Sequence, residues 1–283
     1  MNFGFSEEQE ELRKMVRRFL EEKSPESEVR RLMATEEGYD PAVWAQMANE
    51  LALQGLGIPE EYGGQGFGPV ELYVVFEEMG AALLCSPYFS TVALAANALL
   101  LVGDEAAKSA YLPGIASGET IATVALTDDA GGWDLSTTST TAERDGDGWV
   151  LSGVRSFVTD GSTASLLLVP ATTDKGLSLF AIEGSASGVE KESLATMDQT
   201  RKQSRLVFTK APATLVGEEG GALAGLEAAV QIAESALAAE QVGGAQRVLD
   251  ASVDYAKNRV QFGRPIGSFQ AIKHKCADML LEV

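Results

Sequence analysis

The chain has 283 residues, of which 45% are hydrophobic and 22% charged, so it is long enough for two or three packed subdomains. Its 41 acidic and 22 basic residues give a net charge of −19, which argues against nucleic acid or an anionic lipid surface as the main partner. Two scattered cysteines and a single histidine argue against a disulfide framework, a zinc site and a Ser-His-Asp triad.

Residues 1–118 have the apolar periodicity of helices and predict an N-terminal helical domain. The first residues are acidic and lack the basic region of a signal peptide, so we expect a cytoplasmic protein. Ser6 and Gln9 have the spacing of a helix capping box, and Pro41 suits the first turn of another helix. The longest apolar run, residues 92–102, is too short to cross a bilayer, so we expect no membrane span.

Residues 119–218 contain short runs rich in β-branched residues and predict a central β domain. The sequence Asp-Gly-Asp-Gly at residues 145–148 is typical of a hairpin turn between two strands. The regular spacing of the runs is typical of a small barrel or a sandwich. The expected strands are 120–126, 137–143, 149–151, 156–159, 165–169, 177–182 and 205–209.

Residues 219–283 are rich in alanine and predict two long helices, one reaching about Asn258 and one starting near Ser268, with no β-sheet in this region. Two such helices cannot bury their apolar faces against each other alone. They need further partner helices, as in a four-helix bundle. The chain ends inside the second helical pattern, so we expect the first half of a bundle, either in a truncated chain or in a naturally short one. We also expect a dimer or tetramer that packs through residues 225–283.

The turn between these helices, RVQFGRPIGSFQ at residues 259–270, is the most informative stretch of the chain. Arg259 offers a planar, charged fork that suits a phosphate or pyrophosphate. Phe262 and Phe269 offer flat apolar faces for a planar ring, and Gln270 offers both a donor and an acceptor. The alternative is a plain corner in which the glycine and the proline end the helices.

This turn closely resembles the RxxFGxPI…FQ signature of the acyl-CoA dehydrogenase family of flavoproteins. Three further segments are similar to family motifs: GIPEEYGG at residues 57–64 to GxPExYGG, TDDAGGWD at 127–134 to TEPxAGSD, and GVRSFVTD at 153–160 to GxKxWITN. The resemblance covers the whole chain and implies an α+β multidomain fold: an N-terminal helical domain, a small central β-barrel and a C-terminal helical bundle. It further implies FAD as cofactor, an acyl-CoA substrate, and electron-transfer flavoprotein or a similar electron acceptor.

The resemblance also assigns residues to the flavin. It implies that Phe157 packs against the flavin ring, for which a place inside the barrel is the alternative, and that Thr159 donates a hydrogen bond near N5. It implies that Arg259, Phe269 and Gln270 reach the FAD of a neighbouring subunit. The cofactor-binding residues implied in this way are Leu126, Thr127, Gly132, Trp133, Phe157, Thr159, Arg259, Phe262, Phe269 and Gln270.

The sequence departs from the family at the residues that bind and deprotonate the substrate. The usual catalytic glutamate would lie beyond Val283, and the alternative position for it is Ala233 here. The arginine that helps to bind the substrate is replaced by Glu234, whose charge repels the polyanionic CoA, and a serine near the substrate is replaced by Trp133. Glu234 is the remaining candidate for a displaced base, although one residue turns a helix by about 100°.

Glu240 falls within the apolar stripe of the long helix. A carboxylate in such a place is either paired or has a raised pKa. Pairing is the better explanation, and we expect Arg247 or a neighbouring subunit to supply the partner.

Two functions remain open from the sequence. The first is an FAD-dependent acyl-CoA dehydrogenase that removes hydrogen from the α and β carbons of the thioester and passes hydride to flavin N5. The alternative is a non-catalytic or half-catalytic subunit of a heteromeric dehydrogenase, which completes the FAD site of a neighbour, such as a paralogous subunit. We expect the isolated chain to be inactive with ordinary acyl-CoAs.

Overall fold

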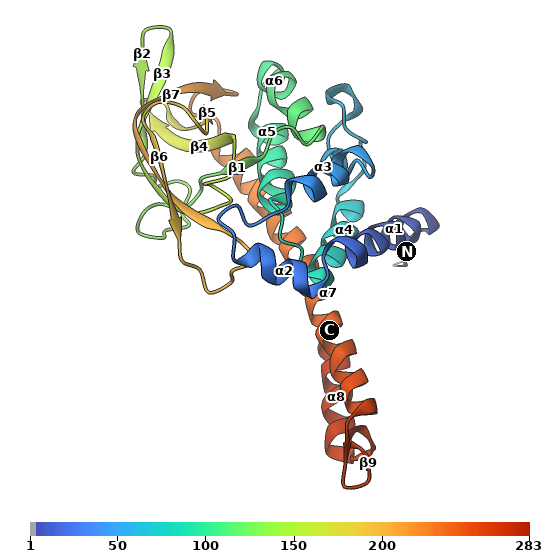
Figure 1. Cartoon of the computed structure of the whole chain (residues 1–283). Helices are drawn as coiled ribbons and strands as arrows, with labels where there is room; N and C mark the ends of the chain where they lie inside the picture. Colours follow the sequence, from blue (N-terminus) through green and yellow to red (C-terminus); the bar gives the residue numbers. More distant parts are fainter. Residues whose placement is uncertain (1–3) are drawn as a thin grey trace.

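A computed structural model describes residues 4–283, and its elements form a helical region, a β-barrel and a C-terminal helical arm in chain order (Figure 1). Helix α1 begins at the predicted capping box, in which Ser6 and Gln9 each accept the other's backbone N–H. Pro41 is the first residue of α3, as predicted. The helical region contains α1 (Glu7–Lys23), α2 (Glu26–Met33), α3 (Pro41–Asn49), η1 (Leu53–Gly55), η2 (Glu60–Tyr62), α4 (Pro69–Ala82), η3 (Phe89–Ala96), α5 (Asn97–Val102) and α6 (Glu105–Ala116).

Helix η3 is a π-helix, a rare form that is often found at functional sites. Where it passes into α5, Asn97 Nδ2 donates to the carbonyls of Val92 and Ala93 at 3.2 and 2.9 Å. These bonds give two backbone oxygens a side-chain donor at the junction of the two helix types. At its other end, Phe89 and Ser90 face the β domain.

The central domain is a closed barrel, which confirms the predicted architecture. Strands β4, β2, β3, β7 and β5 pair in this order, and β5 pairs again with β4. Strand β1 is added beside β4, and β6 is added beside β7. The strands are β1 (Ala122–Val124), β2 (Thr141–Asp145), β3 (Gly148–Thr159), β4 (Leu166–Thr173), β5 (Gly176–Glu183), β6 (Val189–Leu194) and β7 (Gln203–Val216).

Two details of the predicted strands are wrong. The expected runs 149–151 and 156–159 are parts of one strand, β3, which continues through a bulge. Strand β6 was not expected, because its central residues Glu190, Lys191 and Glu192 are charged and it lies at the edge of the sheet. The predicted hairpin turn joins β2 to β3, where Asp145 pairs with Gly148.

Helix α7 (Leu223–Asn258) packs its first half on α4, α5 and η3. Its second half and α8 (Gln270–Glu282) project from the body as an arm (Figure 1). The expectation of no β structure here is wrong, because β8 (Val260–Gln261) pairs with β9 (Arg264–Pro265) ahead of the short turn η4 (Ile266–Ser268). Phe262 and Gly263, at φ 53° and 76°, form the tight turn that allows this pairing.

Glycines let α4 and α7 cross at very short distance. A Cβ atom at Gly80 would lie 1.9 Å from the carbonyl oxygen of Glu240, and one at Gly243 would lie 1.8 Å from that of Glu77. Only glycine fits at these two positions without moving the helices apart. The crossing therefore holds α7 against the helical region at the level of Glu240. Within residues 4–283, no helix is both long enough and apolar enough to span a membrane.

Candidate functional site

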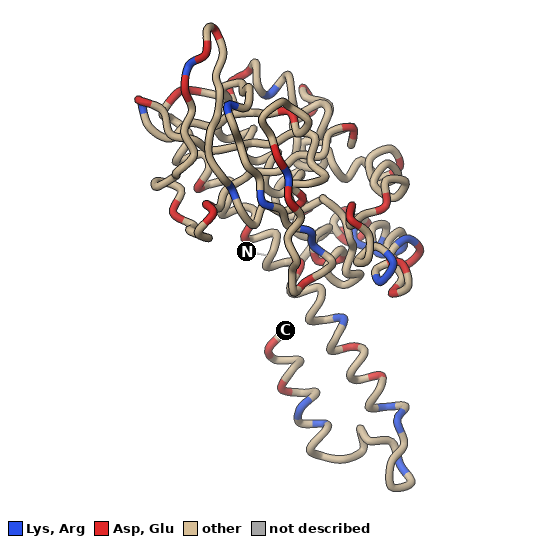
Figure 2. The backbone as a smooth tube through the Cα atoms, turned by 60° about the vertical axis from the view of Figure 1, so that its left-hand side comes forward, with Lys and Arg blue, Asp and Glu red and all other residues tan. Residues whose placement is uncertain are grey.

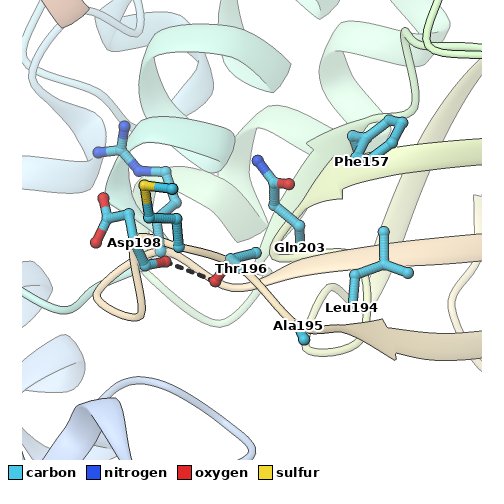
Figure 3. A pocket seen from close by; sticks show the side chains of 8 residues that line it. Phe157, Leu194, Ala195, Thr196, Asp198 and Gln203 are labelled. Atoms are coloured by element: carbon cyan, nitrogen blue, oxygen red, sulfur yellow. Dashed lines mark hydrogen bonds between the residues drawn. The ribbon is translucent and has the colours of Figure 1, made fainter.

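A cavity of about 400 Å³ opens beside Phe157, between the end of β3 and the loop that joins β6 to β7 (Figure 3). Its wall combines an aromatic ring and apolar side chains with a few polar groups, as small-molecule sites do. The lining residues are Phe157, Leu194, Ala195, Thr196, Met197, Asp198, Arg201 and Gln203.

A β-bulge places Phe157 at this cavity. Ser156 and Phe157 of β3 lie opposite a single residue of β7, Arg205. The φ angle of Phe157 is 57°, a conformation that bulky residues rarely adopt, and its side chain is 48% exposed. The alternative of an inward-facing barrel residue is therefore wrong. Strained backbone that exposes an aromatic ring is a common feature of functional sites.

The glycine segment 127–134 lies beside the bulge. Thr127 is buried, and its carbonyl accepts the backbone N–H of Ser156 at 3.1 Å. A Cβ atom at Gly131 would lie 3.6 Å from the Phe157 ring, and a Cβ atom at Gly132 would meet open space. Trp133 follows with its side chain 73% exposed. The structure thus brings this segment and Phe157 together.

A buried arginine anchors the start of this segment. Arg155 is 2% exposed and donates to the Asp128 carboxylate at 2.5 Å and to the Leu126 carbonyl at 3.1 Å. It also donates to the Thr138 hydroxyl and to the Pro170 carbonyl. Burial lowers the pKa of Arg155 to about 10, while the charge of Asp128 acts against the shift. Arg155 remains a cation at neutral pH and ties the segment to the barrel.

Thr159 lies two residues beyond Phe157 on the same strand. Its carbonyl accepts the Thr123 hydroxyl at 2.7 Å, which joins β3 to β1. Its own hydroxyl forms no hydrogen bond with any residue in the described range 4–283, so it has a donor to offer. The amide of Gln203, which faces the cavity, is free in the same sense.

Arg201 lies where the barrel meets η3 and α7. Its Nη2 atom donates to both carboxylate oxygens of Glu240 at 2.7 Å, and its guanidinium packs over the Phe89 ring at 4.8 Å. Glu240 is paired, as predicted, but the predicted partners were wrong. Arg247 lies seven residues further along α7, which is roughly 10 Å of helix. Sequence reasoning missed Arg201, because 39 residues separate it from Glu240.

Asp160 is a second carboxylate near Arg201 that sequence reasoning missed. It is buried and accepts the Ser90 hydroxyl at 2.6 Å. Burial raises the pKa of Asp160 to about 6, although the Ser90 hydrogen bond and the charge of Arg201 lower it. The sequence feature that could have identified it is that this chain has aspartate at the position where the family motif has asparagine. Asp160 directly follows β3, and its hydrogen bond to Ser90 thus joins the end of this strand to η3.

Glu234, the candidate base, does not reach the cavity. It is exposed on α7 and forms no hydrogen bond or ion pair with the residues that the structure describes. Ala233, at the family's alternative base position, is 3% exposed and packs into the core. Among the described residues, the only carboxylate in the cavity lining is Asp198, whose Oδ1 accepts the backbone N–H and the hydroxyl of Thr200 at 2.9 and 2.6 Å.

The residues of the turn lie at the far end of the arm, where β9 is seen in Figure 1. The guanidinium of Arg264 stacks over Phe269 at 4.1 Å, and Phe262 packs edge-on against Phe269 at 6.2 Å. Arg259 and Gln270 are exposed, and within residues 4–283 their side chains form no hydrogen bond. The structure brings the two phenylalanines together, but it does not bring the turn to Phe157 of the same chain.

The end of the arm is basic on an otherwise acidic chain. Residues 255–277 contain five Lys or Arg and no Asp or Glu, against a net charge of −19 for the whole chain (Figure 2). Apolar side chains are also exposed along the arm, among them Tyr255 at 60% and Leu281 at 87%. An exposed surface of this kind is typical of an interaction site.

Three family models match the chain: "Acyl-CoA dehydrogenase, N-terminal domain" over residues 6–119, the middle domain over 123–211 and the C-terminal domain over 226–283. Acyl-CoA dehydrogenase IpdE2 from Mycolicibacterium smegmatis is 34% identical over 98% of this chain and 74% of its own length. A solved variant of the steroid ACAD Tcur3481-Tcur3483 is 34% identical, with a TM-score of 0.87 over 98% of this chain and 74% of that chain. The ChsE4-ChsE5 complex from Mycobacterium tuberculosis is 30% identical, with a TM-score of 0.87 over 100% of this chain and 75% of that chain.

Proposed function

This chain belongs to the acyl-CoA dehydrogenase family, and we propose that it is a flavin-binding subunit for the α,β-dehydrogenation of an acyl-CoA thioester. The observation that carries the proposal is the exposed Phe157 ring, which a bulge holds at a cavity beside the glycine segment 127–134. FAD, when bound, supplies a hydride acceptor at its N5 atom.

The residues at the cavity fit a flavin. A volume of about 400 Å³ is within the usual range of small-molecule sites, roughly 300–1,000 Å³. Phe157 would cover a face of the planar ring, and the unpaired hydroxyl of Thr159 would donate to its polar edge. Gly132, with open space where a side chain would stand, would let backbone N–H groups approach the cofactor.

A neighbouring subunit would complete this site through its arm. Arg259 would bind the pyrophosphate by charge-assisted hydrogen bonds, and Phe269 and Gln270 would contact the rest of the cofactor. This part of the proposal is supported by the free side chains of Arg259 and Gln270 and by the basic arm end. The exposed apolar side chains of the arm would be buried in the same contact, which yields about 25 cal/mol per Å² of apolar surface. The assembly is a dimer or a tetramer.

The second candidate is a half-catalytic subunit of a heteromeric dehydrogenase, and the position of Glu234 favours it. Among the residues that the structure describes, the cavity lining contains a single carboxylate, Asp198, whose Oδ1 is bonded to Thr200, and Glu234 is turned to solvent. In this version a paralogous subunit supplies the base, and the present chain contributes its arm to the neighbour's flavin site. The similar ChsE4-ChsE5 structure is a complex of two different components, which supports a heteromeric assembly here.

A flavin titration tests the first proposal. We expect the purified chain to bind FAD, and we expect Phe157→Ala to weaken binding by about tenfold through the loss of ring contact. Phe67→Ala is the matched control, because Phe67 is 51% exposed but does not line this cavity. Equal FAD affinity in the Phe157→Ala variant and the wild type would remove the flavin from this cavity.

A further inference from the structure

We infer that Asp129 is a positioning residue that sets the direction of the Phe157 ring, acting through Ser156 and Arg205. The inference deepens the proposed function, since it takes Phe157 to be the residue that faces the flavin. The family motif has proline where this chain has Asp129, and proline has no side-chain acceptor. The contacts of Asp129 are therefore a feature of this chain and not of the motif.

Asp129 is the centre of a three-residue cluster. Its Oδ1 atom accepts from Ser156 Oγ at 2.6 Å and from Arg205 Nε at 2.8 Å. Its Oδ2 atom accepts from Arg205 Nη2 at 3.2 Å. The three side chains come from the glycine segment, from β3 and from β7, so one carboxylate ties three separate parts of the chain together.

The cluster lies on the bulge itself. Ser156 is the residue before Phe157, and Arg205 is the single residue of β7 that faces the bulged pair. Asp129 therefore contacts both strands at the bulge, β3 through Ser156 and β7 through Arg205. The backbone N–H of Ser156 also donates to the Thr127 carbonyl at 3.1 Å. Backbone with a positive φ at a bulky residue persists only where its surroundings hold it.

Packing holds the ring only in part. The Phe157 side chain is 48% exposed, and the neighbouring glycine segment offers no side chain at Gly131 or Gly132. The direction of the ring must then follow from the backbone of residues 156–157. Strand pairing on both sides of the bulge and the contacts of Ser156 hold that backbone, and Asp129 accepts the side-chain contact of Ser156.

The charge of the cluster is stable over the neutral range. Hydrogen bonds from Arg205 and then from Ser156 lower the pKa of Asp129 to about 2. At neutral pH the carboxylate is therefore ionised and accepts in both contacts. Asp129→Asn keeps the shape and can still accept at Oδ1, but it removes the negative charge and replaces Oδ2, the acceptor for Arg205 Nη2, with a donor that Arg205 cannot satisfy.

The segment should stay folded without Asp129, because Arg155 anchors it independently through Asp128 and the Leu126 carbonyl. This separation allows a direct measurement. Trp133 is the next-to-last residue of the segment and is 73% exposed, whereas Trp44 and Trp149 are 5% and 7% exposed. Acrylamide quenching of tryptophan emission therefore reports the segment, and Phe157→Trp in a Trp133→Phe background reports the ring position.

We expect Asp129→Asn to raise the quenching constant of both reporters and to weaken FAD binding by about tenfold, the effect of one lost charge-assisted hydrogen bond. Ser156→Ala should act in the same way, and the double variant should add little. Asp147→Asn, an exposed carboxylate at the other end of β3, is the matched control and should change neither quantity.

Unchanged quenching and unchanged FAD affinity in a folded Asp129→Asn protein would overturn the inference. Should that variant fail to fold by circular dichroism, Ser156→Ala decides by the same two criteria, since it removes a single hydroxyl. Altered quenching in a protein that binds no FAD in any form would support the positioning role and refute the proposed function. The two failures are thus told apart.

Discussion

The ion pair between Arg201 and Glu240 should hold the barrel to α7, and a double-mutant cycle measures how strongly. Its two contacts are 2.7 Å long and charge-assisted, and the two side chains are 26% and 20% exposed. A hydrogen bond to a charged group contributes about 1.5–3 kcal/mol. Exposed ion pairs contribute about 0–1 kcal/mol, and partial screening places this pair between the two cases, at a coupling of about 1–2 kcal/mol.

The assay is urea unfolding of the wild type, Arg201→Ala, Glu240→Ala and the double variant. Each single change should cost about 2 kcal/mol, because it leaves a partly buried charge without its partner. Glu234→Ala is the control on the same helix and should change the free energy of unfolding by less than about 0.5 kcal/mol. A coupling below about 0.5 kcal/mol would refute the idea that this pair joins the domains.

Three further changes test other parts of the structure. Gly243→Ala should destabilise the protein by about 1–3 kcal/mol, because its Cβ would lie 1.8 Å from the Glu77 carbonyl oxygen, whereas Gly244→Ala, at 3.6 Å from the nearest atom, should be tolerated in the same unfolding assay. The folded pKa of Asp160 is raised to about 6, so between about pH 4 and 6 the folded protein binds a proton that the unfolded chain has lost. The free energy of unfolding should therefore fall as the pH rises from about 4 to 6. Asp160→Asn should remove about 1–3 kcal/mol of this pH dependence. If the free energy of unfolding of the variant still falls with pH as in the wild type, Asp160 is not its cause. Arg259→Ala should lower FAD retention after gel filtration without changing the melting temperature of the FAD-free protein, and unchanged occupancy would exclude Arg259 from the cofactor site.

The order of the three regions could be predicted from the sequence, because helical and strand periodicities differ and change near residues 119 and 219. Motif residues that lie on one continuous segment, such as Thr127 and Gly132, could also be assigned to the same place from the sequence. The direction of Phe157 could not be predicted. It depends on one extra residue in β3 relative to β7, a count that no local pattern contains.

Contacts between remote segments were beyond the sequence for a related reason. Arg201 and Glu240 are 39 residues apart, and Ser90 and Asp160 are 70 residues apart. Each side chain alone has several plausible partners, and only the fold selects one. Strand β6 was missed because its local sequence is ambiguous: its charged residues suit a solvated edge strand as well as a loop.

The most direct test of the account is anaerobic mixing of the FAD-saturated chain with a panel of acyl-CoAs, followed at the flavin absorbance band. We predict no bleaching by the isolated chain, because Ala233 is buried, Glu234 is turned to solvent, and the one carboxylate in the described cavity lining, Asp198, is bonded to Thr200. Bleaching should appear only when a subunit that supplies the base is added. Bleaching by the isolated chain would contradict the account, and its loss in Glu234→Gln would then identify Glu234 as the base.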